Sequence, residues 1–82
     1  MKKKCEHIVT NIHQEGIAQE MGIEVGDILL KINNQDISDI FDYHYLVNDE
    51  YIELLIKKPT GEEWLLEIDK EENEDLGMDF ES

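Results

Sequence analysis

Two glycines and their neighbours constrain this chain most strongly. The stretch GIAQEMGIEVGDILLKIN occupies residues 16–33. Gly22 is placed to end a short helix, because glycine adopts the left-handed conformation of helix ends at little steric cost. Gly26 provides a second such residue for the turn before Asp27, and the apolar run that follows predicts a strand over 27–33. A helix, a sharp turn and a strand are therefore expected within one short stretch.

Hydrophobic periodicity predicts the remaining elements. The expected order is a strand over 6–12, a short helix over 17–21, a strand over 27–33, a helix over 39–48, strands over 51–58 and 63–69, and a possible last strand within 76–80. Asn33-Asn34 and the segment 58–62 carry turn residues, and Ser38 is expected to cap the longer helix. The order predicts an α+β fold, in which a partly open sheet or barrel is capped by one short and one longer helix.

The longer helix carries more apolar surface than one packing face needs. Six residues form a wide stripe: Ile40, Phe41, Tyr43, His44, Tyr45 and Val47. We expect the first, third and last of these to be buried, and Leu46 to lie on the opposite side. The other three either pack on the sheet or face a ligand groove.

Charge limits the partners of the chain. The net charge is −14, from 21 acidic residues, seven lysines and no arginine. Phosphate backbones and anionic lipid surfaces would be repelled, so nucleic acid and membrane partners are not expected. No apolar run approaches the roughly 20 residues that span a bilayer, and no secretory leader follows the basic start. With the single cysteine Cys5, these features predict a soluble cytoplasmic domain, expected to be a monomer.

The candidate metal-binding patterns lack required ligands, and the candidate nucleophiles Ser38 and Cys5 lack support, because Ser38 is explained as a helix cap and Cys5 lies beside Glu6. Cys5, His7 and His13 are zinc-ligand residue types, but a structural site needs four converging ligands. A calcium loop starting at Asp69 would need glycine at its sixth position and glutamate at its twelfth, and the twelfth is Phe80. The chain is therefore expected to be non-enzymatic, with no cofactor and no metal of its own.

The segment IVTNIHQEGIAQEMGIEVGDILLKINNQDI, residues 8–37, resembles the core signature of a PDZ domain. This resemblance implies that a peptide adds as a strand between one strand and the second helix, and that a GLGF-type loop holds its terminal carboxylate. That loop normally precedes the strand found here at Ile8. The nearest match is DLGMDF, residues 75–80, a position that suits the circularly permuted bacterial type. Its acidic neighbours have the wrong charge for a carboxylate.

The layout is also similar to the N-terminal PDZ-like domain of bacterial iron–sulfur oxidoreductases of the radical SAM type. There a similar DLG-x-x-FE segment leads into a catalytic domain with clustered cysteines. The resemblance implies that an iron–sulfur cluster and S-adenosylmethionine would belong to a parent domain outside this chain, since the chain has no cluster cysteines.

These observations give one expected organisation. Residues 1–5 are expected to be frayed, 6–69 to form the PDZ-like domain, 70–75 to be an acidic linker, and 76–82 to be a last strand or the start of a connection. The peptide-binding candidates are Phe41, His44, Tyr45, Leu76, Gly77 and Met78. The leading hypothesis is an interaction module of a larger bacterial enzyme that binds a peptide or protein segment. The alternatives are a structural domain packed on its own C-terminal catalytic domain, and the PDZ domain of a bacterial protease.

Overall fold

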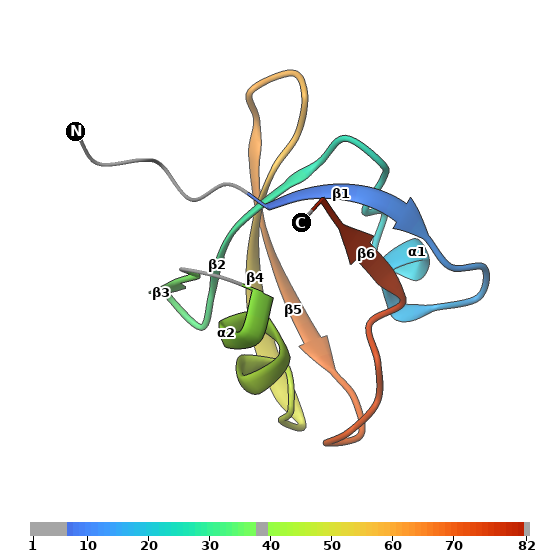
Figure 1. Cartoon of the computed structure of the whole chain (residues 1–82), viewed down its shortest axis with the longest axis vertical. Coiled ribbons are helices and arrows are strands. Elements are labelled where there is room, and N and C mark those ends of the chain that lie inside the picture. The colour runs from blue at the N-terminus through green and yellow to red at the C-terminus, as the bar shows by residue number, and fades with distance from the viewer. Residues whose placement is uncertain (1–6, 38–39, 82) are drawn as a thin grey trace.

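The strands and helices follow the predicted order. The computed structural model describes residues 7–37 and 40–81, so the N-terminal segment, Ser38 as a helix cap, and Ser82 lie outside the described residues. The elements are β1 (His7–Ile12), α1 (Ile17–Glu20), β2 (Ile28–Ile32), β3 (Gln35–Asp36), α2 (Ile40–Leu46), β4 (Tyr51–Lys57), β5 (Glu63–Asp69) and β6 (Met78–Phe80) (Figure 1). No helix within the described ranges is long and apolar enough to span a membrane.

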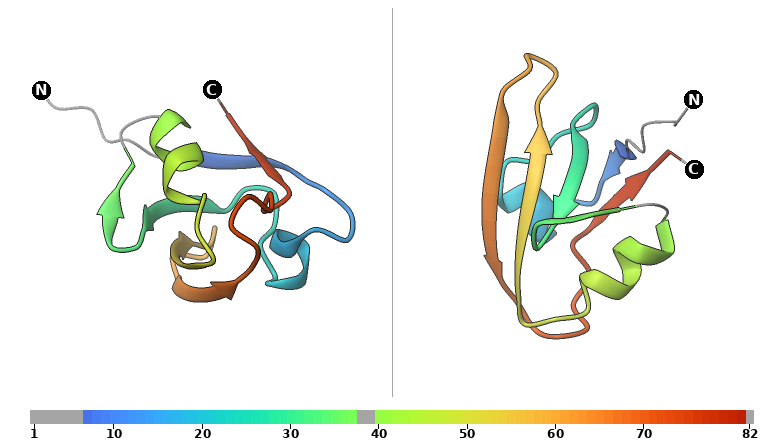
Figure 2. Two further views of the ribbon diagram at one scale, coloured as in Figure 1. Left: turned by 90° about the horizontal axis from the view of Figure 1, so that it is seen from below. Right: turned by 90° about the vertical axis from the view of Figure 1, so that its left-hand side faces the viewer.

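The strands form one antiparallel sheet in the order β5-β4-β2-β1-β6, with β3 paired to β2. The first and last strands are therefore neighbours: Ile12 lies opposite Met78, and Val9 lies opposite Phe80. In Figure 2 the sheet curves strongly, and α2 lies alongside β6 in both views. The fold is a small curved sheet with two short helices, which agrees with the predicted α+β class, although α2 ends earlier than the predicted helix over 39–48.

The turn residues have the backbone conformations expected of them. Gly22 and Gly26 have φ values of +87° and +99°, in the region that favours glycine. Asn33 and Asn34 have φ values of 52° and 64°, which suit the two-residue hairpin joining β2 to β3. The sequence indicated this turn but not β3, because two exposed polar residues carry no alternating pattern.

The core lies inside the curved sheet and beneath both helices. Its buried hydrophobic residues are Val9, Ala18, Ile23, Leu29, Ile32, Ile37, Tyr43, Val47, Ile52, Leu54, Ile56, Ile68, Leu76 and Met78. Within β2, Leu29 and Ile32 are buried, whereas Ile28 and Leu30 are only partly buried. An irregularity in the pairing of β2 with β4 falls between Leu29 and Lys31.

Helix α2 packs through a narrower face than predicted. Tyr43 and Val47 are buried as expected, whereas the side chain of Ile40 lies outside the described set. The prediction that Leu46 lies on the opposite side is wrong, because Leu46 packs against the core. Residues three and four positions apart share a helix face, so Leu46 and Val47 pack against the core on the same face of α2 as Tyr43.

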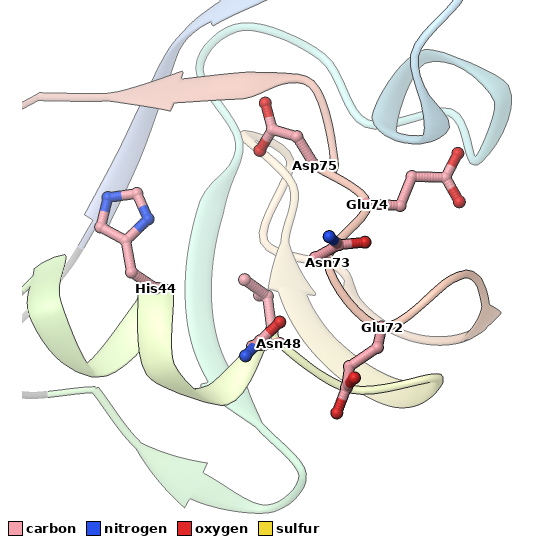
Figure 3. A pocket seen from close by; sticks show the side chains of 7 residues that line it. His44, Asn48, Glu72, Asn73, Glu74 and Asp75 are labelled. Atoms are coloured by element: carbon pink, nitrogen blue, oxygen red, sulfur yellow. The ribbon is translucent and has the colours of Figure 1, made fainter.

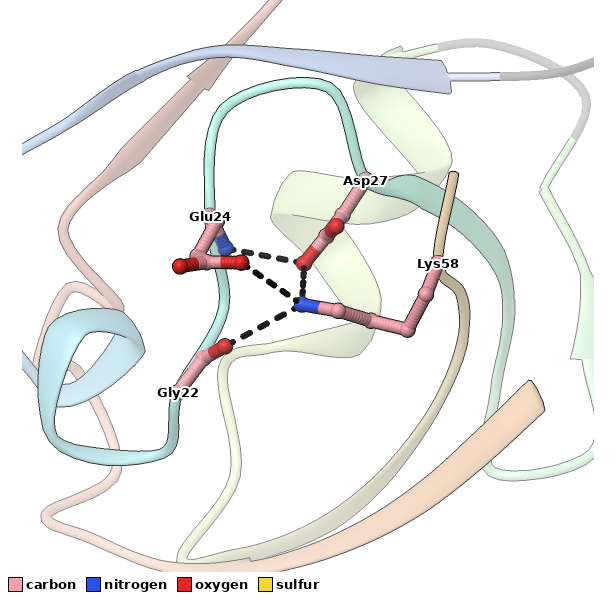
Figure 4. Close-up of polar contacts among 4 residues, drawn as sticks. All are labelled: Gly22, Glu24, Asp27 and Lys58. Atoms are coloured by element: carbon pink, nitrogen blue, oxygen red, sulfur yellow. Dashed lines mark hydrogen bonds and ion pairs between the residues drawn. The ribbon is translucent and has the colours of Figure 1, made fainter. Parts of the chain in front are cut away.

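A buried ion pair joins the start of β2 to the end of β4 (Figure 4). Lys58 Nζ lies 2.5 Å from Asp27 Oδ2, and the two residues are 8% and 0% exposed. The same ammonium group donates to the carbonyl oxygen of Gly22 at 3.3 Å and lies 4.5 Å from the Trp64 ring centre. Asp27 Oδ2 also accepts the backbone N–H of Glu24 at 2.8 Å. The pair therefore ties the end of α1, the β2 turn and the β4–β5 hairpin together.

Candidate functional site at the edge formed by β6 and α2

Strand β6 presents an edge that no other strand covers among the described residues. Its inner side pairs with β1: Gly77 O accepts the His13 N–H at 2.9 Å, and the Glu81 N–H donates to Ile8 O at 2.9 Å. Because backbone groups alternate along an antiparallel strand, the N–H and C=O groups of Met78 and Phe80 point toward the open edge. An unpaired edge of this kind is a template for an added strand.

The segment that leads into β6 is held close to the turn after β1. Leu76 O accepts the Ala18 N–H at 2.8 Å. Gly77 has a φ of +83°, and a Cβ placed on it would lie 3.2 Å from the Cα of Gly16. The two backbones approach this closely because both residues lack a side chain. The position of the LGM segment, residues 76–78, is therefore fixed by backbone contacts rather than by side chains at its surface.

A pocket of about 170 Å³ lies between the C-terminal end of α2 and the acidic segment before β6. Its lining residues are His44, Val47, Asn48, Glu72, Asn73, Glu74 and Asp75. In Figure 3 His44 and Asn48 form one side, and the chain from Glu72 to Asp75 forms the other. Residues 70–75 are exposed or half-buried and carry hydrogen bonds of their own, such as Glu74 N–H to Glu71 O at 3.0 Å.

Helix α2 contacts β6 through an aromatic pair. The Tyr43 and Phe80 rings lie 4.8 Å apart at an interplanar angle of 72°, an edge-to-face geometry that aromatic pairs favour. The buried Tyr43 hydroxyl has no hydrogen-bond partner among the described residues. Burial raises the pKa of this phenol, and the nearby Asp75 and Asp79 carboxylates raise it further. Tyr43 therefore stays neutral and fixes the spacing between helix and strand.

Asp79 is the polar residue at the centre of β6. Its Oδ2 accepts from Asn11 Nδ2 at 3.1 Å and lies 3.1 Å from His13 Nε2. The Asn11 hydrogen bond lowers the pKa of Asp79, and the hydrogen bond and charge of His13 lower it further. The carboxylate is thereby kept ionised and anchored to β1.

Replacing Asn11 with alanine should raise the pKa of Asp79 toward its ordinary value, because the largest cause of the lowered pKa is removed. A carboxyl group whose pKa is lower in the folded state stabilises the fold above its unfolded pKa, and this stabilisation is lost as pH falls through the folded pKa. NMR titration of the Asp79 carboxyl carbon would measure the change. Gln35→Ala, which removes an exposed amide on β3, is the control, and an Asp79 pKa unchanged by Asn11→Ala would contradict the assignment.

The structure brings part of the predicted peptide-binding set together. His44 lines the pocket, and Gly77 immediately precedes β6, but the side chains of Leu76 and Met78 are buried in the core. Those two residues can therefore offer only backbone groups to a ligand. Phe41 and Tyr45 are 77% and 81% exposed and do not line the pocket. Their role in peptide binding stays a prediction.

Sequence reasoning missed Asp79 and Asn48 as site residues. Because side chains alternate between the two faces of a strand, the LGMDF segment could have shown that Asp79 lies on the face opposite to the apolar Met78 and Phe80. Asn48 follows the last helical residues and carried no signal of its own. No group of three or more His, Cys, Asp or Glu side chains within the described ranges is arranged to hold a metal ion.

Comparison with known proteins identifies the family of the domain, through a match that ends before β6. The sequence model of the PDZ domain family matches residues 8–70, which is most of the chain. A comparison with curated proteins gives no match. The matched residues include the two glycine turns, α2 and the β4–β5 hairpin. The chain belongs to the PDZ domain family.

Proposed function

We propose that this chain is a non-catalytic interaction module, which binds an extended peptide or protein segment along β6. The observation that carries the proposal is the open edge of β6 beside α2, with the fixed LGM segment at one end. Addition of a strand to such an edge is a recurring mode of peptide recognition, in which backbone hydrogen bonds provide affinity and side-chain pockets provide specificity. Membership of the PDZ family supports an interaction role.

The chain order supports a circularly permuted arrangement within this proposal. The LGM segment comes after β5 in sequence, yet it leads into a strand that pairs with β1. A loop that precedes the first strand in the usual PDZ order would occupy the same place in space. The incoming segment would lie antiparallel to β6, and its end would reach the pocket beside His44 and Asp75.

Titration of the isotope-labelled domain with a library of extended peptides tests the proposal. We expect chemical-shift changes along 76–80 and 44–48, together with slower hydrogen exchange of the Phe80 amide, because its N–H would gain a partner. The other free edge of the sheet, β5, serves as the internal control and should not shift. Chemical-shift changes confined to β5, or no chemical-shift changes at any peptide concentration, would contradict binding at β6.

A second candidate is a structural role, in which the domain packs against another domain of a longer protein such as the iron–sulfur oxidoreductases it resembles. The exposed Phe41 and Tyr45 side chains favour this candidate, because they are large, apolar and absent from the lining of the pocket. Under this role no free peptide binds, so the peptide titration should show no chemical-shift changes, with or without the substitutions Phe41→Ser and Tyr45→Ser. Both substitutions would weaken association with the neighbouring domain, measured by calorimetry with that domain added in trans.

A further inference from the structure

We propose that the occupant of the groove between β6 and α2 is a basic extended segment that presents a lysine or arginine side chain to the pocket, and not a chain end with a free carboxylate. This inference rests on the function proposed above and adds the charge class of the partner. It follows from the charges that line the pocket, the cations available within the domain, and the charges along the edge of β6.

The pocket is acidic on its loop side. Glu72, Glu74 and Asp75 supply three carboxylates, whereas the helix side supplies His44, Val47 and Asn48. Figure 3 shows the Asp75 side chain directed toward the side of α2, whereas Glu74 is directed away from it. One oxygen of Glu74 also accepts the Glu71 N–H at 3.2 Å. Asp75 is therefore the carboxylate best placed to meet an incoming group, and Glu72 adds a second charge to the same side of the pocket.

The lysines in the described ranges do not neutralise this pocket. Lys58 is buried against Asp27, and Lys31 lies 3.9 Å from Asp36 on β3. Lys57 pairs in register with Ile28 and Glu63, away from the pocket lining. Lys70 is the nearest along the chain, but its ammonium group donates to the carbonyl oxygens of Glu71 and Glu72, at 3.0 Å each. No lysine is part of the pocket lining.

The acidic character continues along the strand itself. Asp79 and Glu81 are exposed on and just after β6, and Asp79 is held ionised by Asn11 and His13. The Tyr43 ring contacts the rings of Phe80 and His44, and its buried hydroxyl has no hydrogen-bond partner in the described part of the chain. A segment added to β6 would therefore meet negative charge along its length as well as at the pocket.

Two effects compete for the end of the incoming segment. The backbone N–H groups of residues 76–78 would attract a carboxylate through their partial positive charges. Full negative charges on Asp75 and Glu72 would repel it, and full charges outweigh oriented dipoles at similar distance. A lysine or arginine side chain would instead be attracted by these two carboxylates. The balance therefore favours a basic residue in a segment that continues past the pocket or ends without a charge.

Four versions of one extended, N-acetylated peptide test this inference. The last residue is either lysine or norleucine, which has the same four-carbon side chain without the ammonium group, and the end is either an amide or a free carboxylate. Affinities come from NMR titration of the labelled domain. The lysine amide should bind most tightly, and either change should weaken it about three- to five-fold, at the upper end of the effect of exposed ion pairs. Added salt should weaken the lysine amide more than the norleucine amide.

Two domain variants with the same net charge serve as a matched pair. Asp75→Asn should reduce the preference for lysine, whereas Glu63→Gln, at the start of β5, should leave it unchanged. Equal effects of the two variants, or tighter binding of the free carboxylate, would overturn the inference while leaving strand addition intact. If no peptide shifts β6 or α2, the proposed function itself is wrong. Groove shifts that depend on protein concentration without peptide would make a second copy the occupant and would also overturn it.

Discussion

Replacing Lys58 with methionine should destabilise the domain by about 3–5 kcal/mol, because the Asp27 carboxylate would remain buried without its counter-charge. Methionine keeps most of the apolar stem, so the loss comes mainly from the charge and its hydrogen bonds. A domain of this size has a total stability of about 4–12 kcal/mol, at roughly 0.05–0.15 kcal/mol per residue. The variant should therefore lose a large part of its folding free energy.

Urea denaturation at neutral pH measures this loss, with Lys57→Met as the control. Lys57 is half-buried and precedes Lys58. Its replacement removes one positive charge but leaves the ion pair between Asp27 and Lys58 intact. The double variant Asp27→Asn with Lys58→Met should recover part of the stability, since no unpaired charge remains. If Lys57→Met and Lys58→Met cost the same, the ion pair does not make the expected contribution.

Replacing Gly77 with alanine should destabilise the domain by about 2–3 kcal/mol, since a side chain in the left-handed region alone costs about 1–3 kcal/mol. The added Cβ would also lie 3.2 Å from the Cα of Gly16. Backbone at that distance cannot move aside without disturbing the hydrogen bond from His13 N–H to Gly77 O. The variant should therefore lose stability and also loosen β6 from β1.

Gly61→Ala separates the two contributions. Gly61 also has a positive φ, +100°, but no atom lies within 4 Å of an added Cβ. Its replacement should show only the conformational cost, and thermal unfolding of both variants would measure the difference. Hydrogen exchange of the Glu81 amide should speed up in Gly77→Ala alone. Equal stabilities and equal exchange in the two variants would show that the approach of Gly16 to Gly77 is unimportant.

Of these variants, Gly77→Ala bears on the site as well as on stability. Lys58 and Asp27 link the β4–β5 hairpin to the turn before β2, and neither residue lines the pocket. Gly77 fixes the segment whose backbone an incoming peptide would meet. A fixed segment has less conformational entropy to lose on binding, which is the physical meaning of preorganisation. If Gly77→Ala weakens peptide binding by more than its larger unfolded fraction explains, the result would support a role of Gly77 in preorganising the site.

The local turns were determined by the sequence alone. Gly22, Gly26 and the Asn33-Asn34 pair adopt positive φ values because these residue types accept the left-handed region, a property of each residue and its neighbours. The strands flanking them followed from hydrophobic alternation. The fold class could therefore be predicted, although β3 was missed because its two exposed residues carry no periodic signal.

The site depended on contacts between distant parts of the chain, which only the tertiary structure decided. Pairing of β6 with β1 joins the two ends of the sequence, and the His13–Asp79 contact spans 66 positions. Helical periodicity could not tell that Leu46 packs inward while Phe41 stays exposed, because that choice depends on where α2 lies on the sheet. Residue chemistry sets local conformation, whereas the partner of a strand edge or a buried charge is set by the packing of the whole chain.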